Sequence, residues 1–235
     1  MARIQVIVAT YAGKGGPRAA VMGGDGFEAG PTDAGKYVLA SVGKHSSSRY
    51  RDWSRIRWGS QLRERGGHLQ VQHDGRWVRL SSLTPVTREQ IMDYHQSLYG
   101  TAKIPERWVF NDFGHVTCYF FKDRNGNRVL DANEKIHGEF FHTTPPDEAA
   151  TAQGLPVTLA PSHGCIHVKP VEIDEMIKKG YMKRGNTIEI HSYDEGLPAL
   201  EKDAKGTKPF EVHFYPGKDT ILILGNKPPA PPAGR

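Results

Sequence analysis

Residues 161–168 have the sequence Pro-Ser-His-Gly-Cys-Ile-His-Val, which joins a polar turn to a short apolar segment. Cys165 follows Gly164 directly, and His163 stands two residues before the thiol. A cysteine attacks as its thiolate, which a nearby imidazole favours. A neighbouring glycine leaves room for a substrate carbonyl and leaves backbone N–H groups available for an oxyanion. The stretch therefore predicts a mildly acidic, nucleophilic thiol, whereas a cysteine considered alone is more often a buried side chain in a tight turn.

The elements around this stretch are predicted to be strands and short helices. A helix is expected at 169–180, with Pro170 near its start and Gly180 at its end, and a second at 87–98. Strands are expected at 3–10, from Lys36, within 50–80, at 115–122, 128–131, 138–143 and 187–190, and in a hairpin formed by 210–214 and 220–224. The fold class is therefore predicted to be mainly β with short helices.

The composition is typical of a folded globular protein. Hydrophobic residues make up 37% of the 235 residues and charged residues 24%. No apolar run approaches the length of about 18 to 20 residues that spans a bilayer, so we expect no integral membrane protein. The 31 basic and 26 acidic residues give a net charge of +5, which favours an anionic partner. The basic residues are dispersed, which argues against nucleic acid.

The two ends of the chain carry different signals. The apolar run 4–9 is interrupted by Gln5 and is shorter than the apolar region of a signal peptide, and its alternation favours a first strand. We therefore predict no export signal in the chain as given. At the other end, the Pro-rich residues 227–235 are expected to stay mobile.

The second cysteine, Cys118, lies in the apolar run 114–121 and is expected to be a buried small hydrophobic residue. Two cysteines make no disulfide framework, and without a Cys-x-x-Cys pair they indicate no zinc site. We predict neither a metal nor a cofactor.

Residues 123–134 permit two interpretations. Oxygen side chains stand at positions 1, 3, 5, 9 and 12 of this segment, as in an EF-hand calcium loop, but Arg128 occupies position 6, where glycine is expected. Asn125-Gly126 is also typical of a type I′ turn, and a plain hairpin is the favoured interpretation. Trp53 and Trp58 likewise permit a glycan groove, although core packing is the default.

Several segments resemble, in the same order, the catalytic domain of the YkuD-type L,D-transpeptidases. Ser162-His-Gly-Cys-Ile166, followed by a helix and the strand Gly185-Asn-Thr-Ile-Glu-Ile190, resembles the cysteine motif of that family. Upstream, Gly30-Pro-Thr-Asp-Ala-Gly-Lys-Tyr-Val38, Glu139-Phe-Phe-His-Thr-Thr144 and Gly154 resemble its earlier segments. The resemblance covers roughly residues 3–192. It implies a YkuD-like β-sandwich or mixed-sheet domain at 1–195 and a C-terminal extension, hairpin and tail, at 196–235.

The resemblance also implies roles for the residues of the cysteine chemistry. Cys165 matches the acyl-forming nucleophile, His142 the general base that activates its thiol, and the carbonyl of Thr143 the group that orients this base. The family has His-Gly-Thr where this chain has His-Thr-Thr at 142–144. His137 is a rival for the base, but it stands outside the matching strand.

The remaining site residues are implied in the same way. Ser162, His163 and Gly164 are expected to shape the site, with backbone N–H groups around the glycine and the cysteine forming an oxyanion hole. His167 stands where the family usually has arginine or asparagine, and with Ser162 it is the expected substrate contact. The longer spacing before the cysteine motif predicts an inserted loop at 145–151.

The function that the resemblance implies is acyl transfer on peptidoglycan tetrapeptide stems, without a cofactor. The enzyme attacks the bond before the terminal D-residue and passes the acyl group to a stem amine in a 3→3 cross-link, to a D-amino acid, or to water. Such a protein acts in the periplasm or cell wall. The alternatives are a secreted antibacterial effector that edits the wall of a rival, with a delivery or immunity partner, and a non-catalytic wall-binding module.

Overall fold

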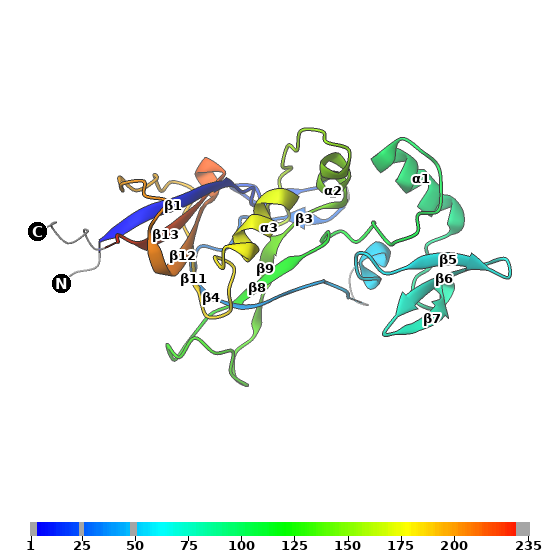
Figure 1. The fold of residues 1–235 in the computed structure, drawn as a ribbon, viewed down its shortest axis with the longest axis horizontal. Coiled ribbons are helices and arrows are strands. Elements are labelled where there is room, and N and C mark those ends of the chain that lie inside the picture. The colour runs from blue at the N-terminus through cyan, green and yellow to red at the C-terminus, as the bar shows by residue number, and fades with distance from the viewer. Residues whose placement is uncertain (1–3, 24–25, 48–50, 229–235) are drawn as a thin grey trace, which may run out of the picture.

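The computed structural model describes residues 4–23, 26–47 and 51–228 and confirms a mainly β architecture with short helices (Figure 1). The large sheet is mixed and eight-stranded, in the order β1-β13-β12-β11-β4-β8-β9-β10. Its strands are β1 (Gln5–Ala12), β4 (Gly35–Gly43), β8 (Thr117–Phe121), β9 (Ile136–His142), β10 (Ile166–His167), β11 (Thr187–Ile190), β12 (Thr207–Tyr215) and β13 (Thr220–Asn226). Two small sheets join β2 (Val21–Met22) with β3 (Glu28–Ala29), and β5 (Leu62–Arg65) with β6 (His68–His73) and β7 (Arg76–Arg79).

The helices are short and lie between these strands. The α-helices are α1 (Arg88–Tyr99), α2 (Pro145–Ala152) and α3 (Pro170–Lys178), and the 3-10 turns are η1 (Asp52–Arg55), η2 (Leu80–Ser82) and η3 (Pro216–Lys218). In the described part of the chain no helix is both long and apolar enough to cross a membrane.

The main core lies between the large sheet and α3. Phe120 on β8, Phe141 on β9 and Phe214 on β12 are fully buried, and Ile173 and Met176 on α3 pack into the same cluster. Burying a side chain of this size contributes roughly 1.5–3 kcal/mol. Apolar burial therefore fixes β9, which carries the candidate base, against the helix that follows the cysteine motif.

The two edges of the large sheet meet at the cysteine motif. Just after β1, the Lys14 N–H donates to the carbonyl of His167 (3.0 Å), and the His167 N–H donates to the carbonyl of Lys14 (2.8 Å). The Ser162 N–H donates to the carbonyl of Gly15 (3.1 Å). A Cβ on Gly16 would lie 1.9 Å from the carbonyl oxygen of Gly30, so only glycine fits there. The chain that leaves β1 therefore backs the candidate site.

The predicted C-terminal hairpin is confirmed, and it lies within the large sheet. β12 pairs in parallel with β11, and β13 lies between β12 and β1. Val212, Ile221 and Ile223 are fully buried members of the main core. Figure 1 shows these strands at the end of the molecule where both termini lie. Because β1 joins the sheet through β13, residues 207–226 attach the first strand to the rest of the domain.

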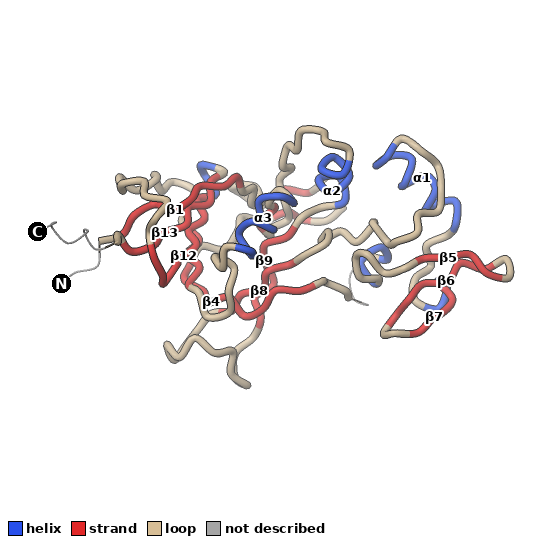
Figure 2. Tube along the Cα trace, viewed as in Figure 1, coloured by secondary structure: helices blue, strands red, loops and turns tan. Residues whose placement is uncertain are grey.

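A second, smaller core lies in the segment between β4 and β8, which the sequence pattern does not set apart. Ile56, Val71, Ile91, Trp108 and Phe110 are its fully buried members. Figure 2 shows its strands β5 to β7 and helix α1 at the end of the molecule opposite the termini. We call residues 51–112 the inserted subdomain.

The elements of the inserted subdomain follow local sequence signals. The Thr87 side chain accepts from the Gln90 N–H (3.2 Å) and the Gln90 side chain accepts from the Thr87 N–H (2.9 Å), which is a capping box. Gly100 ends α1 in the left-handed conformation. Trp53 packs on Trp108 with ring centroids 5.7 Å apart, which confirms core packing for this tryptophan.

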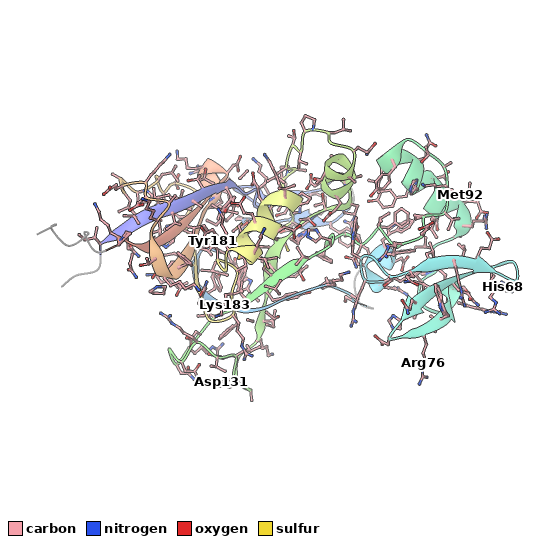
Figure 3. The ribbon with its side chains drawn as sticks, in the orientation of Figure 1. His68, Arg76, Met92, Asp131, Tyr181 and Lys183 are labelled. Carbon is pink, nitrogen blue, oxygen red and sulfur yellow. The ribbon has the colours of Figure 1, made fainter. Side chains whose placement is uncertain are left out.

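The strand predicted at 128–131 and the two-residue hairpin turn are wrong, because 122–135 is one long loop between β8 and β9. The Asp123 carboxylate accepts from the N–H groups of Gly126 (2.8 Å) and Arg128 (2.9 Å). These N–H groups are therefore not available for the hydrogen bonds between paired strands. Arg128 has φ 60°, the left-handed conformation that an EF-hand loop usually assigns to glycine. Figure 3 shows Asp131 at the periphery of the molecule. Calcium binding stays the less favoured interpretation of this segment.

The structure also differs from expectation at 145–151 and at Lys227. The loop expected at 145–151 is wrong, because these residues form α2: Thr144 caps the helix by accepting from the Asp147 N–H (3.4 Å), and Pro145 occupies its first turn. The Pro-rich tail lies outside the described residues from 229 onward, and Lys227, which we placed in the tail, still donates its N–H to the carbonyl of Ile4 (2.8 Å).

We predict that truncation after Gly206, which removes β12 and β13, abolishes folding. It deletes several fully buried side chains at roughly 1.5–3 kcal/mol each, against a typical net stability of about 5–15 kcal/mol. The milder variant Ile223→Ala should cost about 2–5 kcal/mol. Thermal melts followed by circular dichroism measure both, and truncation after residue 228, which keeps every described strand pair, is the control. An unchanged melting temperature without 207–235 contradicts the prediction.

Candidate active site

The cysteine motif forms a tight bend that leads into β10. The Ser162 hydroxyl donates to the carbonyl of Cys165 and accepts from the Gly164 N–H (3.0 Å). Gly164 has φ 135°, and a Cβ there would lie 2.7 Å from Oε1 of Glu139. Residues 163–165 are a bend and not a strand, so strand alternation does not place His163 beside the cysteine. The glycine is required by backbone conformation and by the close approach of β9.

The bend places Cys165 beside the end of β9. His167 on β10 pairs in parallel register with His142 on β9, and the Val168 N–H donates to the carbonyl of His142 (3.0 Å). The pocket of about 220 Å³ at this junction is lined by Cys165 and His142 together with Ser162, His163 and His167. Five of the seven predicted site residues therefore share one cavity.

The hydrogen bonding of His142 fixes its tautomer. Its Nδ1 lies 2.7 Å from the carbonyl oxygen of Thr143, and because a carbonyl only accepts, Nδ1 carries the proton. Burial, and then the nearby His167, lowers the pKa of His142 well below its usual value. The ring is therefore neutral at pH 7, with an unprotonated Nε2 that can accept a proton.

His167 is a second neutral imidazole in the pocket. Its Nδ1 donates to the carbonyl of Ala160 (2.8 Å), and its ring lies edge-on to that of His142, with centroids 4.7 Å apart. Burial lowers the pKa of His167 as well. Two uncharged imidazole rings thus stand side by side at the pocket.

The prediction of a mildly acidic thiol at Cys165 is wrong for the free protein. The pKa of Cys165 is raised to about 12, mainly by burial and in addition by the carboxylate of Glu139. A hydrogen bond from the backbone of Phe140 partly offsets this rise. Burial also raises the pKa of Glu139, to about 7. The neighbouring imidazole gives no compensating charge because it is neutral. Cys118 is fully buried, as expected, and burial raises its pKa also.

Thr143 and Gly164 of the predicted set do not line this pocket. The Thr143 side chain donates to the carboxylate of Glu148 on α2, and the same carboxylate contacts the ring of His115. The other nitrogen of this ring lies 2.8 Å from the carboxylate of Asp174 on α3. This chain of contacts fixes the carbonyl that orients His142. The Gly164 N–H, expected in the oxyanion hole, is engaged by Ser162 in this state.

His137, the other candidate for the base, makes its contacts outside this pocket. Its Nδ1 accepts from the Glu139 N–H (3.1 Å), its Nε2 lies 3.4 Å from Asp33, and its ring stacks on Phe120. It does not line the pocket of Cys165, whereas His142 does. The geometry therefore favours His142.

Sequence reasoning missed one wall of the pocket. Arg51, Tyr94 and Asp112 of the inserted subdomain line it, as do Pro145 and Pro146 of α2. Burial raises the pKa of Asp112, whose carboxylate accepts from the Ser54 hydroxyl (2.6 Å). No local motif marks these residues, because they reach the site only through the packing of a subdomain distant in sequence.

Comparison with known protein families identifies this chain. The model of the YkuD family, described as the L,D-transpeptidase catalytic domain, matches residues 4–190. No curated protein and no solved structure matches the chain. The match extends from β1 to the end of β11 and includes both His142 and Cys165. Because it covers well over half of the 235 residues, the chain belongs to the YkuD family of L,D-transpeptidase catalytic domains.

Proposed function

We propose that this protein is a peptidoglycan L,D-transpeptidase that forms a thioester on Cys165. Membership of the family implies peptidoglycan L,D-transpeptidase-type activity. The observation that supports the assignment to residues is that Cys165 and the neutral ring of His142 line one and the same pocket. Because the substrate is cell-wall peptidoglycan, we infer that the protein acts outside the cytoplasm.

The first half of the reaction acylates the thiol. Nε2 of His142 takes the proton from Sγ of Cys165 as the sulfur attacks the carbonyl carbon before the terminal D-residue of a tetrapeptide stem. The resulting oxyanion is stabilised by backbone N–H groups near Cys165. The C–N bond then breaks, the imidazolium returns its proton to the leaving amine, and a D-amino acid departs.

The second half transfers the acyl group. An amine of a neighbouring stem, a D-amino acid or water loses a proton to Nε2 of His142 and attacks the thioester, and the thiolate of Cys165 leaves and recovers the proton. These acceptors give, respectively, a 3→3 cross-link, an exchanged stem and a shortened stem. The pocket of about 220 Å³ is below the usual range for whole ligands, about 300–1,000 Å³, which suits the scissile residues alone.

The resting charges determine how the attack begins. With the pKa of Cys165 raised to about 12 and that of His142 well below its usual value, thiol and imidazole are both neutral at pH 7. The nucleophile therefore forms only as the proton moves, during attack on a bound carbonyl. This makes the free thiol weakly reactive toward other electrophiles.

We predict that Cys165→Ala abolishes release of D-alanine and formation of new cross-links. The change removes the only atom that can carry the acyl group in this mechanism. Incubation with purified tetrapeptide muropeptides and mass spectrometry of the products measures this, with Cys118→Ala as the control for loss of the other, buried thiol. Product formation by Cys165→Ala contradicts the enzyme proposal, and a wild-type protein that binds muropeptides without converting them favours the wall-binding module.

We predict that His142→Ala lowers turnover by about 10²–10⁴-fold, the usual contribution of a general base. His137→Ala, which removes an imidazole outside the pocket, is the matched control and should retain most of its turnover. Circular dichroism verifies that both variants are folded. The assignment of the base fails if His137→Ala is inactive while His142→Ala turns over normally.

We predict that alkylation of Cys165 by iodoacetamide is slow at pH 7 and accelerates about tenfold per pH unit up to pH 10. The thiolate fraction rises in this way when the pKa lies near 12. Glu139→Gln, which removes a charge that raises this pKa, should increase the rate measured at pH 9 by peptide mass spectrometry. A rate that is already constant between pH 7 and 8 indicates a thiolate at rest and contradicts the neutral pair.

A further inference from the structure

A second cluster of ionisable side chains lies on β11 and β12, and none of its members lines the pocket of Cys165. Glu189 on β11 is in register with His213 on β12, and His191 follows the end of β11. One ligand atom from each of the three residues lies within 4.8 Å of the others. The two histidines are only 8% and 7% exposed, whereas the Glu189 side chain is 27% exposed.

The outer nitrogen of each histidine faces a carboxylate. Nδ1 of His191 lies 2.7 Å from Oε1 of Glu195, and Nε2 of His213 lies 3.4 Å from Oε2 of Glu211. An ionised carboxylate only accepts hydrogen bonds, so each outer nitrogen carries a proton. A neutral imidazole has one proton, so both inner nitrogens then present lone pairs.

These inner nitrogens, Nε2 of His191 and Nδ1 of His213, are only 2.9 Å apart. Two lone pairs at this separation repel each other, and Oε2 of Glu189, 3.9 Å from Nδ1 of His213, adds a negative charge. A metal cation held between the two inner nitrogens and the carboxylate would remove this repulsion. The ring of Tyr215 stacks on His191 (3.9 Å, 7°) and prevents the imidazole from turning away.

We propose that Glu189, His191 and His213 form a binding site for a zinc-class divalent cation. Two imidazoles and one carboxylate are a ligand set that zinc prefers, at about 2.0–2.1 Å from each nitrogen. Two nitrogens that face each other across 2.9 Å reach this geometry with a small outward shift. Glu195 and Glu211 supply the outer carboxylates that orient metal-bound histidines and raise their basicity.

The other three-residue cluster, Asp33, His137 and Glu139, lacks these features. It contains a single histidine, the Asp33 side chain is 68% exposed, and Glu139 already accepts from the Asp33 N–H (2.9 Å). The charge of Arg128 acts on the outer carboxylate of Glu211. At Glu189 itself the competing cation is Lys36, whose Nζ lies 3.5 Å from the carboxylate. Its side chain is 75% exposed and can move into solvent.

The site joins three parts of the chain. Glu189 lies at the end of the segment that the family model matches, and His191 directly follows that segment. His213 belongs to the hairpin beyond it, and Glu195 lies in the connection between β11 and β12. A bound cation therefore clamps β12 to β11. This clamp acts on stability and is independent of the proposed transpeptidase reaction.

The test is zinc binding by the full chain carrying Cys165→Ala, so that the active-site thiol takes no metal. After treatment with a chelator, we expect one zinc ion per chain in isothermal titration calorimetry with zinc sulfate, confirmed by metal analysis after gel filtration. At a free zinc concentration of 100 times the Kd, the melting temperature should rise by about 5 to 10 °C.

The variants separate this site from other metal contacts. His191→Gln and His213→Gln should abolish binding, and Glu195→Gln should weaken it by about 10–100-fold. His137→Gln, in the other cluster, should bind as the parent does. Glu189→Gln changes a partly exposed residue and is the variant to use if a histidine variant fails to fold, with an expected loss of at least about tenfold. A parent chain without stoichiometric zinc, unchanged binding by Glu189→Gln, or a loss with His137→Gln overturns the proposal.

Discussion

The short parallel pairing of β9 with β10 is the contact on which the candidate site depends. It sets His167 beside His142 and is fixed by the hydrogen bond from the Val168 N–H to the carbonyl of His142. The cysteine bend immediately before β10 is thereby held against the end of β9. Behind it, Lys14 pairs with His167, so β1 and the hairpin that anchors it also support the site. A hairpin that lies beyond the family match therefore matters to the geometry within it.

Burial determines the chemistry of this junction. A thiol next to a charged imidazole is acidic, but an imidazole that is itself buried and that faces another histidine remains neutral. Burial then raises the pKa of Cys165, and Glu139 reinforces the effect. The hydrogen bond to Thr143 leaves the basic nitrogen of His142 without a proton. The site is consequently a neutral donor–acceptor pair, and in the mechanism that we propose it becomes reactive only when a carbonyl is bound.

Short sequence motifs correctly predicted the helices that these motifs specify. They did not predict the features of the site that depend on tertiary packing. The capping box at Thr87 and the Pro170 start of α3 specify their helices without help from distant residues. The charge state of Cys165 depends on burial and on Glu139, and the pocket wall from Arg51 and Tyr94 depends on the docking of the inserted subdomain. Neither is visible in a motif. The loop 122–135 shows the opposite case. Its Asn-Gly pair predicts a tight turn, but the backbone N–H groups of Gly126 and Arg128 donate to the Asp123 carboxylate and form a longer loop.

The protonation of His142 in the resting protein is the measurement that tests this account most directly. Nitrogen-15 NMR of the histidine side chains, assigned by comparison with a His142→Gln spectrum, distinguishes the two neutral tautomers from the imidazolium. The account predicts a neutral ring with its proton on Nδ1 at pH 7, and no protonation of Nε2 as the pH falls to 6. A doubly protonated His142 at pH 7 would mean that the resting pair is thiolate and imidazolium, and would contradict it.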